Sequence, residues 1–168
     1  MTNPKLREVL ETLELAVKRK TERAADFFEP YEKQQKFFEL GATKRERLLL
    51  AGNQTGKSYA AAFEVKCHLT GEYPKWWTGR RFEKPVKCWM AGLSSLAVRD
   101  VQQKLLCGEP GVVSAYGSGM IPKNAFVDLP SRARGVDSSY DTIQVKHKTN
   151  GIEDGVNSLA RLERGHFK

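Results

Sequence analysis

Apolar residues near the start of the chain recur at every third or fourth position. The recurrence runs from Leu6 to Val17 and predicts an amphipathic helix over residues 3–28. The second half of this helix is polar on all sides, so we expect it to meet solvent or a charged surface. We treat residues 1–29 as an N-terminal helical extension and expect its apolar stripe to pack on the following domain or on a partner.

The next segments alternate between helical and strand patterns. Residues 31–41 have the amphipathic spacing of a short helix that ends at a glycine. The apolar run 48–50 predicts a buried strand, residues 57–69 predict a helix, and residues 85–92 predict a second buried strand. The two strands and the helix between them would form a β-α-β unit.

The C-terminal half continues with shorter elements. A helix is expected over residues 96–106, capped by the serines that precede it, and a glycine- and proline-rich loop follows. Residues 125–129 and 142–147 have β character, and Thr149-Asn150-Gly151 supplies a turn after the second of them. We therefore predict an α/β fold for residues 30–168, with a sheet flanked by helices.

The segment between the first predicted strand and its helix carries the clearest chemistry. Small residues there let backbone N–H groups curl round phosphate oxygens, and the helix that follows directs its positive end at the same anion. Lys57 would reach the β- and γ-phosphates of a nucleoside triphosphate, and the Ser58 hydroxyl would ligate Mg²⁺. The segment comprises Ala51, Gly52, Asn53, Gln54, Thr55, Gly56, Lys57 and Ser58.

This P-loop, or Walker A, pattern departs from the usual one at its first position. Ala51 stands where glycine is usual, and only a small Cβ has to be tolerated there. The alternative is an ordinary strand-turn-helix with a chance Gly-Lys-Ser, but the flanking pattern favours nucleotide binding.

A possible base-recognition element lies just upstream of the P-loop. Gln34 and Gln35 are candidates to read adenine, because a primary amide offers a donor and an acceptor together. Tyr31 is a candidate to stack on the base. The alternative is that both glutamines are surface residues of the short helix.

The composition narrows the class of partner and the compartment. The 168 residues are 40% hydrophobic and carry a net charge of +8, which favours an acidic partner such as nucleic acid. Clusters of basic residues are also typical of solvated faces. No apolar run is long enough for a membrane span and no signal peptide is evident, so a cytosolic protein is expected. The three cysteines and three histidines lack metal-ligand spacing, so we expect buried free thiols.

The loop over residues 72–82 is both aromatic and basic. Trp76 and Trp77 lie beside Arg80 and Arg81, a composition that suits a stacking surface for nucleic acid. Aromatic residues in connecting loops more often anchor the loop to the core, and we favour this second interpretation.

Over residues 30–158 the chain resembles the N-terminal ATPase region of the large terminase subunit of tailed bacteriophages. The resemblance rests on residues 30–35, 45–58, 68–82 and 117–122. It implies a RecA-like (ASCE) parallel sheet with helices on both faces, ATP and Mg²⁺ as ligands, and a second, nuclease domain. It also implies double-stranded DNA, a small terminase subunit and a portal protein as partners, in a homo-oligomer within the bacterial host cytoplasm.

An ATPase of this type needs an acidic pair at the end of a later apolar strand, to hold Mg²⁺ and to polarise water. No such pair occurs, and Phe126-Val127-Asp128 is a poor substitute. We therefore expect a terminase piece that ends before its catalytic carboxylates, binds nucleotide without turnover and leaves an open sheet edge. The alternative is a catalytically silent remnant that acts as a nucleic-acid- or protein-binding module.

The spacing of residues in the sequence does not identify which arginine would contact the γ-phosphate bound to a neighbouring subunit. The candidates are Arg45, Arg47, Arg80, Arg81, Arg132 and Arg134.

Overall fold

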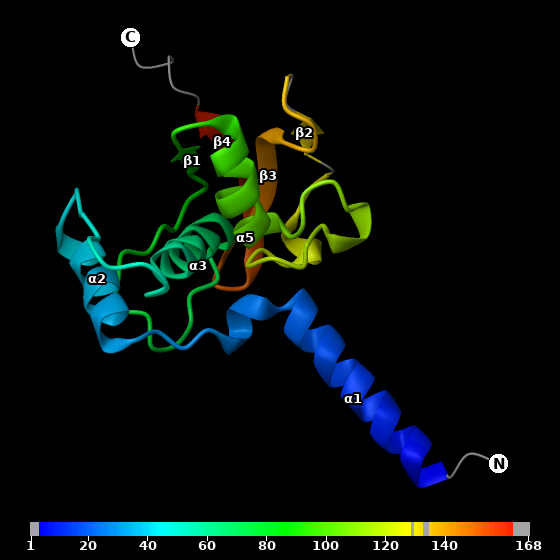
Figure 1. Ribbon diagram of the computed structural model, residues 1–168. Helices are drawn as coiled ribbons and strands as arrows, with labels where there is room; N and C mark the ends of the chain where they lie inside the picture. Colours follow the sequence, from blue (N-terminus) through cyan, green and yellow to red (C-terminus); the bar gives the residue numbers. More distant parts are fainter. Residues whose placement is uncertain (1–3, 129, 133–134, 163–168) are drawn as a thin grey trace.

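The computed structural model describes residues 4–128, 130–132 and 135–162 of the chain. The helices and strands follow one another as shown in Figure 1. In chain order they are α1 (Pro4–Glu22), η1 (Ala24–Phe27), α2 (Glu32–Thr43), α3 (Lys57–Thr70), β1 (Lys87–Ala91), α4 (Ser95–Ala97), η2 (Val98–Gln103), α5 (Lys104–Cys107), η3 (Val113–Ala115), η4 (Lys123–Ala125), β2 (Ser131–Arg132), β3 (Tyr140–Thr149) and β4 (Ile152–Leu162).

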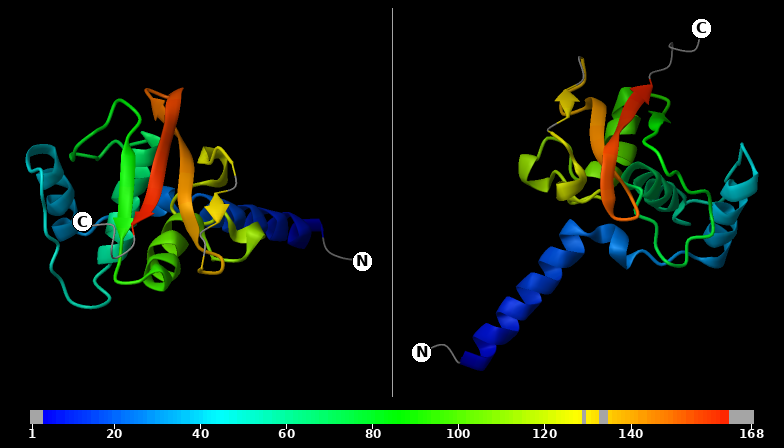
Figure 2. Two further views of the ribbon diagram at one scale, coloured as in Figure 1. Left: turned by 90° about the horizontal axis from the view of Figure 1, so that it is seen from above. Right: turned by 180° about the vertical axis from the view of Figure 1, so that it is seen from behind.

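The sheet has four strands in the order β1-β4-β3-β2. β1 runs parallel to β4, whereas β4, β3 and β2 pair in antiparallel fashion. α3 and the helical stretch from α4 to α5 lie on one face of this sheet, and no helix of the described residues covers the opposite face (Figure 2). The predicted mixture of helices and strands is confirmed, but the sheet is mixed and covered on one face, unlike the parallel, doubly covered sheet that was expected.

The core lies between α3 and the central strands. Alternation along β3 buries Ile143 and Val145 against the helix, while Gln144 between them is exposed. Phe63 of α3 and Leu159 of β4 are also buried. The β character predicted for residues 142–147 is therefore confirmed, and the strand extends beyond both predicted ends.

The predicted strand at residues 48–50 does not form. Leu48 is 79% exposed and Leu50 is 82% exposed, and residues 46–52 have no regular secondary structure. A strand needs a neighbour for its backbone groups, and among the described residues none pairs with this segment. The β-α-β unit is therefore absent from the described part of the chain, where β1 is an edge strand that pairs with β4 and whose Trp89 is 68% exposed.

α3 has the ends that the sequence predicted. It begins at Lys57, directly after Gly56 with a φ of +77°, and it ends at Thr70 before Gly71 with a φ of +70°. A Cβ on Gly71 would lie 2.1 Å from the backbone oxygen of Lys148. Glycine is required at this position both by the left-handed backbone and by the closeness of β3.

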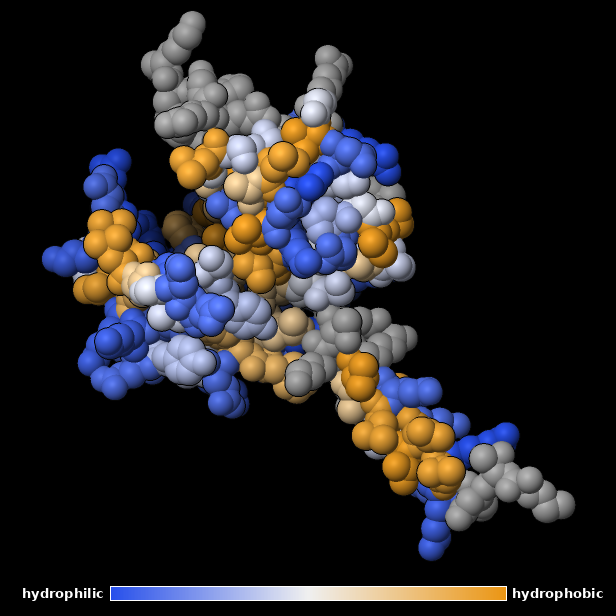
Figure 3. Space-filling view, viewed as in Figure 1, coloured by the Kyte–Doolittle hydropathy of each residue, from blue (hydrophilic) through white to orange (hydrophobic). Residues whose placement is uncertain are grey.

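α1 leaves the body of the molecule and runs into solvent (Figure 1). Its apolar residues form a stripe along one side, visible in Figure 3, and Leu6, Leu10 and Leu13 are each about half exposed, at 51%, 48% and 56%. The predicted amphipathic helix is confirmed, but it ends at Glu22, six residues earlier than predicted, and the expected packing on the domain is not found among the described residues. No helix in the described part of the chain is long and apolar enough to cross a membrane.

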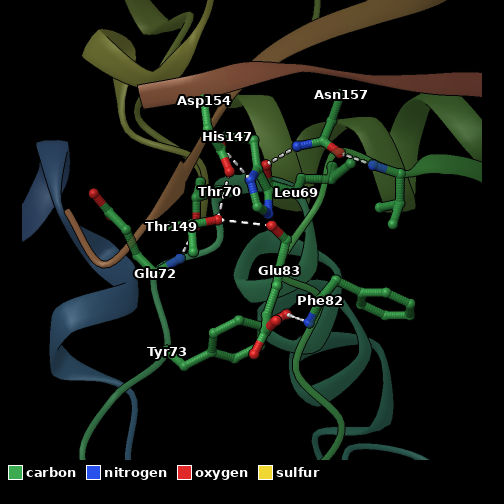
Figure 4. A network of polar contacts seen from close by, with 11 residues as sticks. Leu69, Thr70, Glu72, Tyr73, Phe82, Glu83, His147, Thr149, Asp154 and Asn157 are labelled. Atoms are coloured by element: carbon green, nitrogen blue, oxygen red, sulfur yellow. Dashed lines mark hydrogen bonds and ion pairs between the residues drawn. The ribbon is translucent and has the colours of Figure 1, made fainter. Parts of the chain in front are cut away.

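Polar side chains connect the C-terminal end of α3 to the sheet (Figure 4). Asn157 is fully buried; its amide nitrogen donates to the Leu69 carbonyl, and its amide oxygen accepts from the backbone nitrogen of Val86. The ring of His147 lies 2.7 Å from a carboxylate oxygen of Asp154. Hydrogen bonds from Thr149 and from this histidine lower the pKa of Asp154. This end of the helix is therefore held by side chains as well as by backbone packing.

The two C-terminal strands are joined by a tight turn. Asn150 and Gly151 both have positive φ, at 53° and 83°, as the turn chemistry predicted. The strand after this turn, β4, was not predicted. The β character expected at residues 125–129 reduces to an isolated bridge between Phe126 and Val145, and residue 129 lies outside the described part.

Candidate nucleotide site

The P-loop segment and the start of α2 enclose a hollow of about 660 Å³. Two of the three residues proposed to recognise the base, Tyr31 and Gln34, face the loop across it. Gln35, the third, does not line it, and neither do Asn53, Gly56 and Ser58. The lining residues are Tyr31, Glu32, Lys33, Gln34, Leu49, Leu50, Ala51, Gly52, Gln54, Thr55 and Lys57.

The loop is built from two left-handed residues and a side-chain hydrogen bond. Gln54 has a φ of 60° and Gly56 a φ of 77°, so the chain turns sharply just before α3. The Thr55 hydroxyl donates to the Gly52 carbonyl over 2.9 Å. This curl places the loop at the N-terminal end of a helix of 14 residues, where unpaired amides and the helix dipole favour an anion.

Lys57 points back into the loop that precedes it. Its ammonium donates to the carbonyl oxygens of Ala51, over 2.8 Å, and Gly52. The Lys57 ammonium, which was predicted to contact phosphate, is thus held against the loop by two neutral carbonyl acceptors. To reach a phosphate, the side chain has to exchange these carbonyls for a charged partner, which makes a stronger hydrogen bond.

Gln34 ties the loop to the start of α2. Its amide oxygen accepts from the Tyr31 backbone nitrogen over 2.9 Å, and its amide nitrogen donates to the Gly56 carbonyl over 3.3 Å. The residue is 6% exposed, whereas Tyr31 is 70% exposed. Both functional groups of Gln34 are thus engaged with the backbone, and the tyrosine ring is accessible. The sequence did not reveal this link; its one signal was a glutamine at the third position of a helix, where side chains cap the N-terminus.

Arg47 braces the segment before the loop against α3. Its guanidinium donates to Glu64 over 2.8 Å and to the Phe37 carbonyl over 2.8 Å. Burial raises the pKa of Glu64, but hydrogen bonds from His68 and Arg47 outweigh it and leave this pKa below its ordinary value. The arginine side chain is 19% exposed. Arg47 therefore has a structural partner inside its own chain.

The other arginine candidates lie in different surroundings. Arg80 and Arg81 stack on Phe82 and Tyr73, with the guanidinium carbon 5.1 Å and 5.2 Å from the ring centres. Arg45 and Arg132 are exposed, and Arg134 lies outside the described residues.

Acidic groups are scarce around the hollow. The carboxylate among its lining residues is Glu32, which pairs with Lys36 over 2.6 Å. Asp128 is exposed and does not line the hollow. Among the residues that the structure describes, no group of three or more His, Cys, Asp or Glu side chains is arranged to hold a metal ion.

The aromatic loop after α3 is anchored in the core, as favoured from the sequence. Trp77 is 4% exposed, and its ring centre lies 5.0 Å from that of Phe38. Trp76 stacks on Phe63 at 5.6 Å with an interplanar angle of 17°. These rings fasten the loop to α2 and α3, so they are not free to stack on nucleic-acid bases.

Two further predictions on single side chains are confirmed. Cys67 and Cys107 are buried free thiols, and burial raises the pKa of each to about 12. Cys88 is half-buried and also free. The hydroxyl of Ser94 accepts a hydrogen bond from the Ala97 backbone nitrogen over 3.2 Å, as a helix cap does.

Comparison with known proteins relates the chain to a phage protein. The chain is 36% identical over 162 residues to a protein described as "Terminase, large subunit" from Salmonella phage P22. The match covers 89% of this chain and 32% of the phage protein, so the chain spans about a third of its relative's length. No family model matches the chain, and no solved structure matches it. The resemblance to terminase large subunits is thereby confirmed.

Proposed function

We propose that this chain, a relative of one segment of a phage terminase large subunit, is the part of a DNA-packaging motor that binds ATP with Mg²⁺. The observation that carries the proposal is the P-loop at the start of α3, with Tyr31 and Gln34 facing it across one hollow. The similarity to the phage protein supplies the process, DNA packaging. It also favours a motor segment over a binding module with no nucleotide.

The residues at the hollow suit a triphosphate ligand. The loop amides and the N-terminus of α3 offer donors, and Lys57 offers a charge that neutral carbonyls now hold. Ser58 is exposed in the first turn of the helix, where its hydroxyl would serve as a Mg²⁺ ligand. Tyr31, at 70% exposure, would stack on the base. Bound Mg²⁺ would neutralise phosphate charge, and the chain would supply binding and orientation.

Binding does not entail hydrolysis in this chain. Polarisation of an attacking water needs a carboxylate or an equivalent group near the γ-phosphate, and Glu32 beside the hollow already pairs with Lys36. We therefore propose nucleotide binding without turnover for these residues alone. Double-stranded DNA, a small terminase subunit, a portal protein and further copies of the motor subunit are proposed partners, in the cytoplasm of the bacterial host.

Binding of a fluorescent ATP analogue in the presence of Mg²⁺ tests the proposal. Lys57→Ala is expected to weaken this binding at least about tenfold, because the loss of a charged phosphate contact removes roughly 1.5–3 kcal/mol. Lys84→Ala is the matched control, since Lys84 is exposed and does not line the hollow. Phosphate release, measured on the same samples, is expected to be absent.

Each contrary result has its own meaning. Equal binding by the two variants, or none by the parent chain, would overturn the nucleotide-binding proposal. Phosphate release that disappears with Lys57→Ala would leave binding intact as a proposal but overturn the absence of turnover. In that case an acid such as Asp128 would have to reach the site.

A further inference from the structure

A second concentration of charge lies at the opposite end of α3 from the P-loop. Two adjoining hollows of about 550 Å³ and about 300 Å³ share Arg23 and Glu72 as a common wall. They lie where α1 meets the body of the molecule, beside Thr70 at the end of α3. Because α3 has 14 residues, this place is about 20 Å from the P-loop.

Cations outnumber acids around the two hollows. Five cationic side chains face two carboxylates, and a third carboxylate, Glu153, stands 3.7 Å from one of the lysines, so an excess of two positive charges remains. The cationic residues are Arg23, Lys66, Lys123, Lys146 and Lys148, and the lining carboxylates are Glu72 and Asp26.

Lys66 is the most unusual of these cations because it is buried. Its side chain is 8% exposed, and an ammonium can donate three hydrogen bonds. Its polar contacts among the described residues are long: 3.4 Å to the Glu72 carbonyl and 3.8 Å to the carboxylate of the same residue. A buried charge that is so weakly satisfied is unfavourable unless an anion or water completes its surroundings.

The remaining lysines are available to an incoming anion. Lys123 is exposed and makes no ion pair with any residue that the structure describes. Lys148 pairs with Glu72 over 3.1 Å, and Lys146 stands 3.7 Å from Glu153, but both pairs are partly exposed. Ion pairs of this kind contribute about 0–1 kcal/mol to stability, so a phosphate can replace the carboxylate with little loss of free energy.

We infer that these hollows bind the phosphate backbone of double-stranded DNA. The inference rests on the proposed role in DNA packaging, which identifies duplex DNA as the polyanion. Lys146 and Lys148 are two residues apart on β3, about 7 Å along a strand, which is close to the axial rise of two base pairs. Because the positive charges are spread over two hollows, they match several backbone phosphates better than a single small anion. Contacts of this type fix position without reading sequence.

A duplex of about 30 base pairs with mixed sequence, labelled for fluorescence anisotropy, tests the inference over a range of salt concentrations. The variant Lys123→Gln/Lys146→Gln/Lys148→Gln is expected to bind at least about tenfold more weakly. It is also expected to lower the slope of log affinity against log salt by about 2–3, because each phosphate contact contributes about 0.9. The matched control is Lys44→Gln/Lys87→Gln/Lys104→Gln, which removes the same charge from exposed positions that line neither hollow.

Glu72→Gln separates a binding role from a structural one by the sign of its effect. If the hollows bind phosphate, removal of this shared carboxylate is expected to tighten DNA binding several-fold. If the cluster only holds the fold together, the same change weakens or leaves DNA binding unchanged, and the inference fails. It also fails if the two triple variants bind the duplex equally well, or if the parent chain does not bind it. A third contrary result would be that polyglutamate, an acidic polymer without phosphate, displaces the duplex from the parent chain.

Failure here is distinguishable from failure of the proposed function. Binding of the ATP analogue is expected to be unchanged in every variant of this cluster, because the P-loop lies at the other end of α3. Loss of DNA binding with intact nucleotide binding would therefore report on these hollows alone.

Discussion

The two ends of α3 are held in different ways. At its C-terminal end, Asn157 and the left-handed Gly71 fix the helix against the central strands, with buried hydrogen bonds and close backbone contact. At its N-terminal end, the loop that carries the P-loop residues is exposed and irregular, and Leu48 and Leu50 face solvent. The proposed ligand site thus stands on a helix that is anchored at its far end by buried contacts, while the loop itself is held by the more exposed hydrogen bonds of Gln34, Thr55 and Lys57.

The largest difference between the two ends of α3 is expected when one methyl group is added at each of them. In Gly71→Ala the new Cβ would lie 2.1 Å from the Lys148 oxygen at a φ of +70°, so β3 has to move away from the helix. We expect a loss of about 3 kcal/mol in the free energy of unfolding. For Gly52→Ala the nearest contact is Thr55 Cγ2 at 3.9 Å, and a loss below about 1 kcal/mol is expected. Urea unfolding of both variants measures these losses. Equal losses in the free energy of unfolding would show that the two ends are held alike.

Replacement of one asparagine near each end of α3 tests the same difference between the two ends. Asn157→Ala leaves the Leu69 carbonyl and the Val86 amide without their buried partner, and a loss of about 2–3 kcal/mol is expected. Asn53→Ala changes an exposed loop residue and is expected to alter stability by less than about 0.5 kcal/mol. Thermal unfolding followed by circular dichroism measures both. A small effect at Asn157 would mean that water replaces the lost amide.

Arg47 is the brace nearest to the loop, and its contribution depends on pH. Because the folded pKa of Glu64 lies below its ordinary value of 4.5, the stability from this pair is present above about pH 4.5 and is lost as pH falls through the folded pKa. We expect Arg47→Met to reduce stability by about 2 kcal/mol at neutral pH and to reduce it less in acid. Urea titrations from about pH 7 to about pH 3 test this. A deficit that stays constant with pH would assign the effect to lost packing instead.

The smallest predicted effect concerns the link between α2 and the loop. Gln34→Ala removes the hydrogen bond to the Gly56 carbonyl, which is expected to weaken binding of the fluorescent ATP analogue by about 1 kcal/mol, or roughly fivefold. Gln35→Ala is the neighbouring control, because Gln35 does not line the hollow. A larger loss with Gln35→Ala would transfer the recognition role to that residue.

Features set by local sequence were predictable. The start of α3 at Lys57, its end before Gly71 and the turn at Asn150-Gly151 follow from helix and turn chemistry within a few residues. Local rules reach these features because the residues that decide them are neighbours in the chain.

Features set by distant partners were not predictable. The apolar run at residues 48–50 was predicted as a strand but finds no strand to pair with among the described residues, so it stays irregular, with Leu48 and Leu50 exposed. β4 was missed for the opposite reason, since Asn157 interrupts an apolar pattern yet is buried because two backbone groups from other elements satisfy it. The cationic hollows were equally hidden, because their residues come from four separate stretches of the chain, within 23–28, 63–76, 122–125 and 146–148.

The free edge of β1 also gives the protein a built-in optical probe. Of the three tryptophans, Trp77 is 4% exposed and Trp76 is packed in the same aromatic cluster, whereas Trp89 on β1 is 68% exposed. Collisional quenchers should therefore reduce the fluorescence of Trp89 far more than that of the buried Trp77. Any segment or molecule that comes to lie along β1 would shield this indole and shift its emission to shorter wavelength, so occupation of the edge can be read without an added label.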